Sequence, residues 1–130
     1  MASSTKITID ALYEGTFSVG TDKQFRPVER DESAEKGALK ISINPFLIRT
    51  PERNILFDAG IGDFGEDTST DIMRENLSKN GLSEYDITDI FLSHLHYDHI
   101  GGLAGKSHNY WELTFPESKI WVSEGGWKKV

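Results

Sequence analysis

The sequence of 130 residues contains no cysteine. Disulfide bonds and thiolate metal sites are therefore excluded, and any metal ion must be held by nitrogen and oxygen ligands. Basic residues are also scarce, because 14 lysines and arginines stand against 21 acidic residues and the formal net charge is −7. Since an acidic surface repels the phosphate backbone, we expect no nucleic acid partner.

Long apolar runs are missing as well. No stretch approaches the roughly 20 apolar residues of a membrane-spanning helix, and the polar segment 1–6 is not followed by the apolar core of a secretory signal. These absences predict a soluble, cytoplasmic protein with no membrane partner. The length is sufficient for one domain with its own core, so we treat residues 1–130 as a single domain.

Alternating apolar and polar residues predict that most of the regular structure is β-sheet. We expect strands at residues 7–11, 16–20, 39–43, 46–48, 55–57, 87–92 and 120–122. Glu14 and Gly15 are expected to turn the first two strands into a hairpin, and residues 50–54 to form the turn of a second hairpin. The charged stretch 21–37 is interpreted as a solvated loop. The last two strands are so apolar that we expect them to be buried.

One helix is predicted between residues 71 and 80, where apolar residues recur at helical spacing. Ser69 or Thr70 is expected to cap its start, and Gly81 occupies the position of the left-handed residue that ends many helices. The residues expected to face the core are Ile72, Met73 and Leu77.

The most informative feature is the segment from His94 to His99, which holds three of the four histidines together with Asp98. This segment directly follows a predicted strand, so its side chains emerge at the end of a sheet. Imidazole nitrogen and carboxylate oxygen are ligands that zinc and similar divalent ions accept. In extended backbone His94 and His96 point to the same side, which allows them to hold one ion together.

The same segment favours a second metal ion. A turn after the first two histidines directs Asp98 and His99 toward a neighbouring position, which predicts a two-metal site with ions roughly 3.5 to 4 Å apart. The glycine pair 101–102 allows backbone to pass close to the site, and residues 99–104 are expected to begin a helix. The alternative is three solvent-exposed histidines on a loop, which the agreement of residue type, spacing and strand context disfavours.

The run Phe-Leu-Ser-His-Leu-His-Tyr-Asp-His-Ile-Gly-Gly at residues 91–102 resembles the signature of the metallo-β-lactamase superfamily. Upstream, the segment 55–60 resembles the strand and Asp-x-Gly turn that lie beneath the metal site of that family, with Asp58 as the aspartate. The resemblance covers nearly the whole chain and includes the later strand 119–123. It implies an α+β fold of the αββα sandwich type, here mainly its N-terminal half, a mixed β-sheet with flanking helices.

By residue type, the resemblance implies that His94 and His96 bind the first metal, while Asp98 and His99 bind the second. Asp98 is also the candidate catalytic residue, and Asp58 is expected to support a ligand histidine from behind. The implied cofactor is zinc, two ions per complete site, with iron or manganese as alternatives. Most members of the family are hydrolases in which a metal-held hydroxide attacks a carbonyl, so we expect a small ester or lactone substrate. The tyrosine within the motif is similar to that of quorum-quenching lactonases and organophosphate hydrolases.

The sequence departs from the family pattern in the number of ligands. Family members complete the site with two more histidines and a bridging aspartate, yet only His108 follows His99, and no aspartate follows Asp98. His108 is an alternative ligand, but residues 106–109 are typical of a surface loop, so we expect a solvated histidine. Residues 123–129 predict the start of a helix. We therefore expect an N-terminal portion of the domain with weak metal binding and negligible hydrolysis on its own.

Half of a sandwich leaves apolar side chains of its sheet facing water, which predicts self-association through the uncovered face or binding of a hydrophobic dye. Two other functions remain open. A non-catalytic metal-binding or partner-dependent module would bind metal tightly without hydrolysing esters or lactones. A phosphodiesterase or nuclease of the same superfamily would hydrolyse bis(p-nitrophenyl) phosphate, although the acidic charge counts against it.

Overall fold

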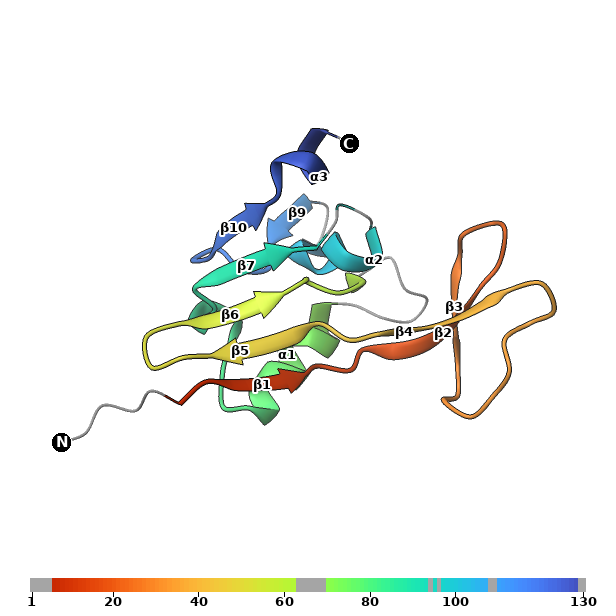
Figure 1. Ribbon diagram of the computed structural model, residues 1–130, viewed down its shortest axis with the longest axis horizontal. Coiled ribbons are helices and arrows are strands. Elements are labelled where there is room, and N and C mark those ends of the chain that lie inside the picture. The colour runs from red at the N-terminus through yellow and green to blue at the C-terminus, as the bar shows by residue number, and fades with distance from the viewer. Residues whose placement is uncertain (1–5, 63–69, 94, 96, 108–109, 129–130) are drawn as a thin grey trace.

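The computed structural model describes residues 6–62, 70–93, 95, 97–107 and 110–128. A mixed five-stranded sheet with the order β1-β5-β6-β7-β10 forms the body of this part of the chain (Figure 1). Its strands are β1 (Thr8–Ala11), β5 (Phe46–Arg49), β6 (Asn54–Phe57), β7 (Asp89–Leu92) and β10 (Lys119–Val122). The first three are antiparallel neighbours, whereas β6, β7 and β10 run parallel. The predicted second hairpin, β5 to β6, is therefore confirmed.

A three-stranded sheet with the order β3-β2-β4 projects beyond one end of the first sheet (Figure 1). Its strands are β2 (Gly15–Val19), β3 (Phe25–Val28) and β4 (Leu39–Ile43). A small apolar cluster lies beside this sheet and consists of Phe17, Phe25, Ile43 and Ile61. Because Ile61 comes from the chain that follows β6, this cluster ties the projecting sheet to the end of the main one.

The predicted first hairpin at Glu14 and Gly15 is wrong. β1 pairs with β5 and β2 pairs with β4, so the chain continues forward through this point and bends from one sheet into the other. The amide of Glu14 donates to the carbonyl of Ile43 at 2.9 Å, which keeps the chain paired across the bend. The predicted loop 21–37 is also partly wrong, because β3 lies within it and pairs with β2. The first error arises because pairing with the distant strand β4 decides the structure at Glu14 and Gly15. The second has a local cause, because β3 pairs with the preceding strand β2 although the stretch around it is rich in charged residues.

One face of the five-stranded sheet packs against the helix α1 (Thr70–Lys79). Leu47 on β5 and Leu56 on β6 are opposite each other in register and are fully buried. Met73 and Leu77 of α1 belong to the same buried cluster. Two of the three predicted core residues of the helix are thus confirmed, while Ile72 is half-buried.

The end of α1 confirms the prediction for Gly81. This glycine has φ +76°, its amide donates to the carbonyl of Ser78, and the amide of Leu82 donates to the carbonyl of Leu77. These two bonds form a Schellman motif, which satisfies carbonyls that the helix leaves without an intrahelical partner. Of the two residues predicted to cap the start, Ser69 lies outside the described residues and the other is the first residue of the helix.

The opposite face of the sheet is open to solvent in the described part of the chain. Register across four strands places one aromatic row on this face, formed by Phe46, Phe57, Phe91 and Trp121. Each of the four keeps between 40% and 47% of its surface exposed, and the rings of Phe91 and Trp121 stack with centroids 5.9 Å apart. The predicted burial of β7 is confirmed for Asp89, Ile90 and Leu92, but Phe91 is exposed, so this strand is not buried on both faces. The prediction is wrong for β10, an edge strand whose four residues are all exposed.

The remaining elements are short. They are η2 (Glu84–Asp86), α2 (Tyr97–Ile100), η3 (Gly101–Leu103), β8 (Ala104–Ser107), β9 (Tyr110–Leu113) and α3 (Glu124–Lys128). The last one confirms the predicted helix start near the end of the chain. β8 and β9 form a two-stranded sheet, so the predicted surface loop 106–109 is partly strand, and His108 lies outside the described residues. None of the described helices is long and apolar enough to cross a membrane.

Candidate metal site

Two parallel strands bring Asp58 and Ser93 to the same edge of the sheet. β6 ends at Phe57 and leads into Asp58, and β7 ends at Leu92 and leads into Ser93 and the histidine segment. Because the two strands are parallel neighbours, the residues that follow them lie side by side. The amide of Asp58 donates to the carbonyl of Phe91 at 2.8 Å, which extends the pairing beyond the end of β6.

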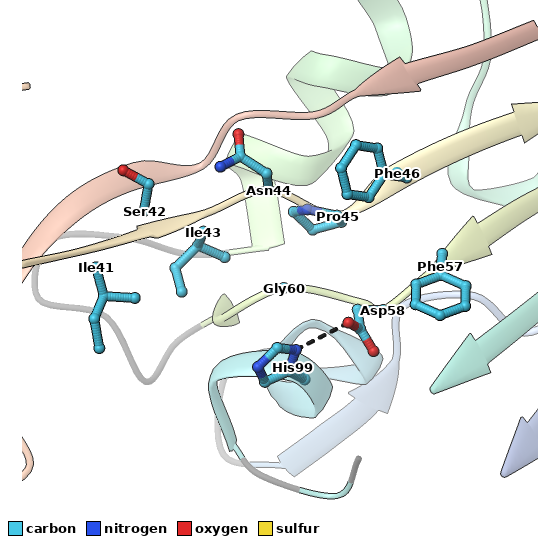
Figure 2. A pocket seen from close by; sticks show the side chains of 10 residues that line it. All are labelled: Ile41, Ser42, Ile43, Asn44, Pro45, Phe46, Phe57, Asp58, Gly60 and His99. Carbon is cyan, nitrogen blue, oxygen red and sulfur yellow. Dashed lines mark hydrogen bonds and ion pairs between the residues drawn. The ribbon is translucent and has the colours of Figure 1, made fainter. Parts of the chain in front are cut away.

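The carboxylate of Asp58 contacts both ends of the histidine segment. At one end it accepts hydrogen bonds from the amide and the hydroxyl of Ser93, each at 2.8 Å. At the other end its Oδ2 lies 2.9 Å from Nδ1 of His99 (Figure 2). Asp58 adopts φ +69°, a left-handed conformation that is uncommon for residues other than glycine. This backbone turn places the carboxylate between the two ends of the segment.

The charge of Asp58 determines the chemical form of His99. Burial raises the pKa of Asp58, but hydrogen bonds from His99 and Ser93 outweigh burial and hold this pKa below its ordinary value. Because an ionised carboxylate only accepts hydrogen bonds, Nδ1 of a neutral His99 carries the hydrogen and Nε2 carries the lone pair. A histidine in this form binds metal through Nε2, with the carboxylate fixing the orientation of its ring.

Close backbone contacts pack the turn after Asp58 against the segment that contains His99. The amide of Ala59 donates to the carbonyl of His99 at 2.8 Å. A Cβ atom on Gly102 would lie 1.9 Å from the carbonyl oxygen of Ala59, so only glycine fits at this position. The predicted close approach of backbone at the glycine pair is therefore confirmed. The helix start predicted within residues 99–104 is confirmed only in part, because the helical residues are 97–103, as α2 and η3, and Ala104 begins the strand β8.

The structure describes only part of the predicted ligand set. His94, His96 and the side chain of Asp98 lie outside what it describes, whereas His99 and Asp58 are described and in contact. Among the described side chains, no three metal-ligating groups lie together. The ligand roles of the four motif residues therefore stay predictions, while the pairing of one of them with its supporting carboxylate is observed.

Comparison with known proteins identifies the family. Residues 40–129 match the family model described as the metallo-beta-lactamase superfamily. The chain belongs to this superfamily. It is similar to the solved structure of AidC, described as a dizinc quorum-quenching lactonase in complex with the product N-hexanoyl-L-homoserine, with 32% identity and a TM-score of 0.71. That match covers 93% of this chain and 43% of AidC.

Two further solved structures support the fold. One is hydrolase AbOPH of the beta lactamase superfamily, with 26% identity and a TM-score of 0.69 over 98% of this chain and 45% of that one. The other is a probable metal-dependent hydrolase from Staphylococcus aureus, with 24% identity and a TM-score of 0.72 over 99% and 50%. A search of curated proteins found no match. The chain spans about half the length of these relatives, and the predicted α+β fold, corresponding to the N-terminal half of the metallo-β-lactamase fold, is confirmed.

The donor chemistry of this superfamily member fits zinc. Three imidazoles and one carboxylate within residues 94–99 supply the nitrogen and oxygen atoms that zinc accepts in a chain without thiolates. The hydrogen bond between Asp58 and His99 is the outer contact that metal-ligating histidines usually make, and it selects the ligating tautomer. The residues present are therefore suited to hold such an ion.

An apolar pocket of about 390 Å³ lies beside the pair formed by Asp58 and His99 (Figure 2). Most of its wall comes from β4, from the link between β4 and β5, and from the ends of β5 and β6. Its apolar lining residues are Ile41, Ile43, Pro45, Phe46 and Phe57. A metallo-β-lactamase-fold protein with this arrangement offers an apolar surface next to a candidate metal ligand.

Two residues that contact the site are not predicted from the sequence. Ser93 completes the hydrogen bonding of Asp58, and its position directly before the first histidine was the only signal. Glu14 was assigned to a turn, yet only 6% of it is exposed and its Oε1 accepts a hydrogen bond from the amide of Ile61 at 2.9 Å. Burial raises the pKa of Glu14 to about 7, although the Ile61 hydrogen bond lowers it. No local pattern predicts this contact, because 47 residues separate the partners.

Proposed function

We propose that this chain is the N-terminal, metal-binding portion of a zinc-dependent hydrolase that acts on esters or lactones. The observation that carries this proposal is the contact of Asp58 with both Ser93 and His99. These bonds hold the two ends of the segment that contains all four predicted ligands. The similarity to a dizinc lactonase at 32% identity supports both the metal and the lactone class.

In the proposed site, His94 and His96 would hold one ion, while Asp98 and His99 would hold the second. Zinc, when bound, supplies Lewis acidity and lowers the pKa of a coordinated water. Asp58 keeps His99 in the ligating tautomer and fixes the plane of its ring. Ser93 donates to Asp58 through both its amide and its hydroxyl, so the carboxylate is held in the orientation that His99 needs.

The pocket beside His99 supports a substrate with an apolar acyl group. Its aromatic and aliphatic walls favour a hydrocarbon chain, since burying apolar surface stabilises a complex by about 25 cal/mol for each Å². The reacting carbonyl would then lie toward His99 and Asp58, which also line the pocket. We therefore propose small acyl-bearing esters or lactones as substrates, and a cytoplasmic location stays a prediction from the sequence.

Elemental analysis tests the metal. We expect zinc, iron or manganese to bind weakly to the 130-residue chain and fully to a version extended to the length of the relatives. His94→Ala and His96→Ala should abolish binding at the first position, whereas His108→Ala serves as the matched control and should retain the metal. Absence of metal from the extended protein, or equal binding by all three variants, would refute the proposal.

Hydrolysis of a substrate panel tests the reaction. The extended protein should hydrolyse acyl lactones or p-nitrophenyl esters, and the His94→Ala and His96→Ala variants should not. Tight metal binding without turnover of any carbonyl substrate would instead identify a non-catalytic metal-binding module. Turnover confined to bis(p-nitrophenyl) phosphate would identify a phosphodiesterase, and either result would contradict the proposed substrate class.

A further inference from the structure

Glu14 is a buried carboxylate that lies outside the predicted ligand set. It comes from the bend between β1 and β2, where its own amide donates to the carbonyl of Ile43 at 2.9 Å. Its side chain crosses to the turn after β6 and accepts a hydrogen bond from the amide of Ile61 at 2.9 Å. Burying a carboxylate is unfavourable unless it satisfies other groups, so a buried acid at this place requires an explanation.

The contact between Glu14 and the turn is tight. A Cβ atom on Gly60 would lie 2.2 Å from Oε1 of Glu14, so the carboxylate rests against the bare backbone of this glycine. On its other side, the carbonyl of Gly60 accepts a hydrogen bond from the amide of Gly102 at 3.2 Å. The turn is therefore held between Glu14 and the segment that follows His99.

The turn itself has a backbone that needs support. Asp58 has φ +69° and Gly60 has φ +83°, so two left-handed residues stand within three positions. Of the two, Asp58 bears the greater cost, because a left-handed conformation is less favourable for aspartate than for glycine, although aspartate tolerates it better than most residues. Without Glu14, the amide of Ile61 would lose its acceptor in a buried place, where an unsatisfied donor is costly.

We propose that Glu14 is a positioning residue of the candidate metal site, which holds the turn 58–61 so that Asp58 keeps its hydrogen bond to His99. Four hydrogen bonds connect Glu14 with His99 through this turn. They join Glu14 to Ile61, Gly60 to Gly102, Ala59 to His99, and Asp58 to His99. The geometric effect needs no metal, whereas its consequence for metal binding rests on the proposed function.

Three substitutions separate the hydrogen bond from other properties of the side chain. Glu14→Ala removes the acceptor, Glu14→Asp keeps the charge but shortens the reach, and Glu14→Gln keeps both the length and an acceptor oxygen. Ser18→Ala is the matched control, because the Ser18 hydroxyl is also a buried side-chain acceptor of one backbone amide, that of Glu35 at 3.1 Å. Ser18 lies on β2, and Glu35 precedes β4, away from the turn.

Nuclear magnetic resonance of the metal-free chain provides the first readout. We expect Glu14→Ala and Glu14→Asp to shift the Nδ1–H signal of His99 and to speed hydrogen exchange of the Ile61 amide. Glu14→Gln should restore both signals, and Ser18→Ala should leave both unchanged even if it lowers stability. If Glu14→Ala fails to fold, the comparison of the aspartate and glutamine variants still decides. An unchanged His99 signal in a folded variant that lacks the acceptor, or an equal change in Ser18→Ala, would overturn the proposal.

Zinc affinity, measured by competition with a chelator, provides the second readout. We expect Glu14→Ala to raise the zinc dissociation constant roughly tenfold, the lower end of the loss seen when outer partners of ligand histidines are removed. Glu14→Gln should stay close to the unsubstituted chain. An equal affinity in Glu14→Ala would refute the metal-positioning role. If the version extended to the length of the relatives binds no zinc at all, the proposed function fails, and the His99 signal alone then decides whether Glu14 positions Asp58.

Discussion

Replacing Glu14 with glutamine should change how the stability of the protein depends on pH. Burial raises the pKa of this carboxyl from 4.5 to about 7, and the hydrogen bond from Ile61 only partly opposes that effect. The folded protein therefore binds a proton at this group more tightly than the unfolded chain does. By linkage, the stabilisation that the folded state gains from binding this proton more tightly is fully present below about pH 4.5. It is lost as the pH rises through about 7.

The size of the effect follows from the pKa values. At about 1.4 kcal/mol for each pH unit, the rise from 4.5 to about 7 corresponds to about 3 kcal/mol of unfolding free energy. This is a large fraction of the roughly 5 to 15 kcal/mol that stabilises an ordinary domain. Glutamine has the same shape and offers the same acceptor to Ile61, but it does not titrate. Any difference in packing between the two side chains is a constant offset that does not vary with pH.

Urea unfolding of the metal-free chain at several pH values measures this effect. We expect Glu14→Gln to gain about 2 to 3 kcal/mol relative to the unsubstituted chain between about pH 5 and about pH 8. Glu75→Gln removes one carboxylate from an exposed position of α1 and controls for the change in net charge. A free-energy difference between the chain and Glu14→Gln that is constant across this range, or that changes in the opposite direction, would refute the raised pKa of Glu14.

Three other predictions concern the turn 58–61, the carboxylate of Asp58 and the open face of the five-stranded sheet. Gly60→Ala should lower the melting temperature of the chain more than Gly81→Ala does. Both glycines have positive φ, but only at Gly60 would the new Cβ meet another atom, Oε1 of Glu14 at 2.2 Å. Equal losses in the two variants would show that this contact is unimportant. Asp58→Asn should raise the zinc dissociation constant about 10- to 100-fold. The control Asp10→Asn, which alters a surface ion pair with Arg49, should leave this constant unchanged. Equal zinc affinities of the two variants would contradict the supporting role of Asp58. Because the four aromatic side chains of the open sheet face are each at least 40% exposed, the 130-residue chain should self-associate or bind a hydrophobic dye, and a dye-silent monomer in analytical ultracentrifugation would argue against an uncovered face.

Local signals in the sequence predicted the elements that depend on local interactions. The helix α1 and its end at Gly81 follow from apolar spacing and from the left-handed conformation that glycine permits. The second hairpin follows from a short polar turn between two apolar runs. The predicted first hairpin is wrong although Glu14 and Gly15 are residues typical of a turn. Hydrogen bonds to the β4–β5 region, about 30 residues away in sequence, keep the chain extended there. The prediction that Trp121 is buried is wrong for a related reason, since an apolar strand is buried only where another layer covers it.

The same division explains how much of the site the sequence reveals. The predicted ligands lie within six consecutive residues, so their types and spacing are visible without any knowledge of the fold. Their supports come from elsewhere, because Asp58 is 35 residues from Ser93 and Glu14 is 47 residues from Ile61. Asp58 was predicted only because the segment around it resembles a family motif, and Glu14, which has no such motif, was placed in a turn. A candidate metal site of this kind therefore displays its predicted ligands in the sequence. The supporting contact of Asp58 becomes visible only when β6 and β7 are placed side by side, and that of Glu14 only when the bend between β1 and β2 meets the turn after β6.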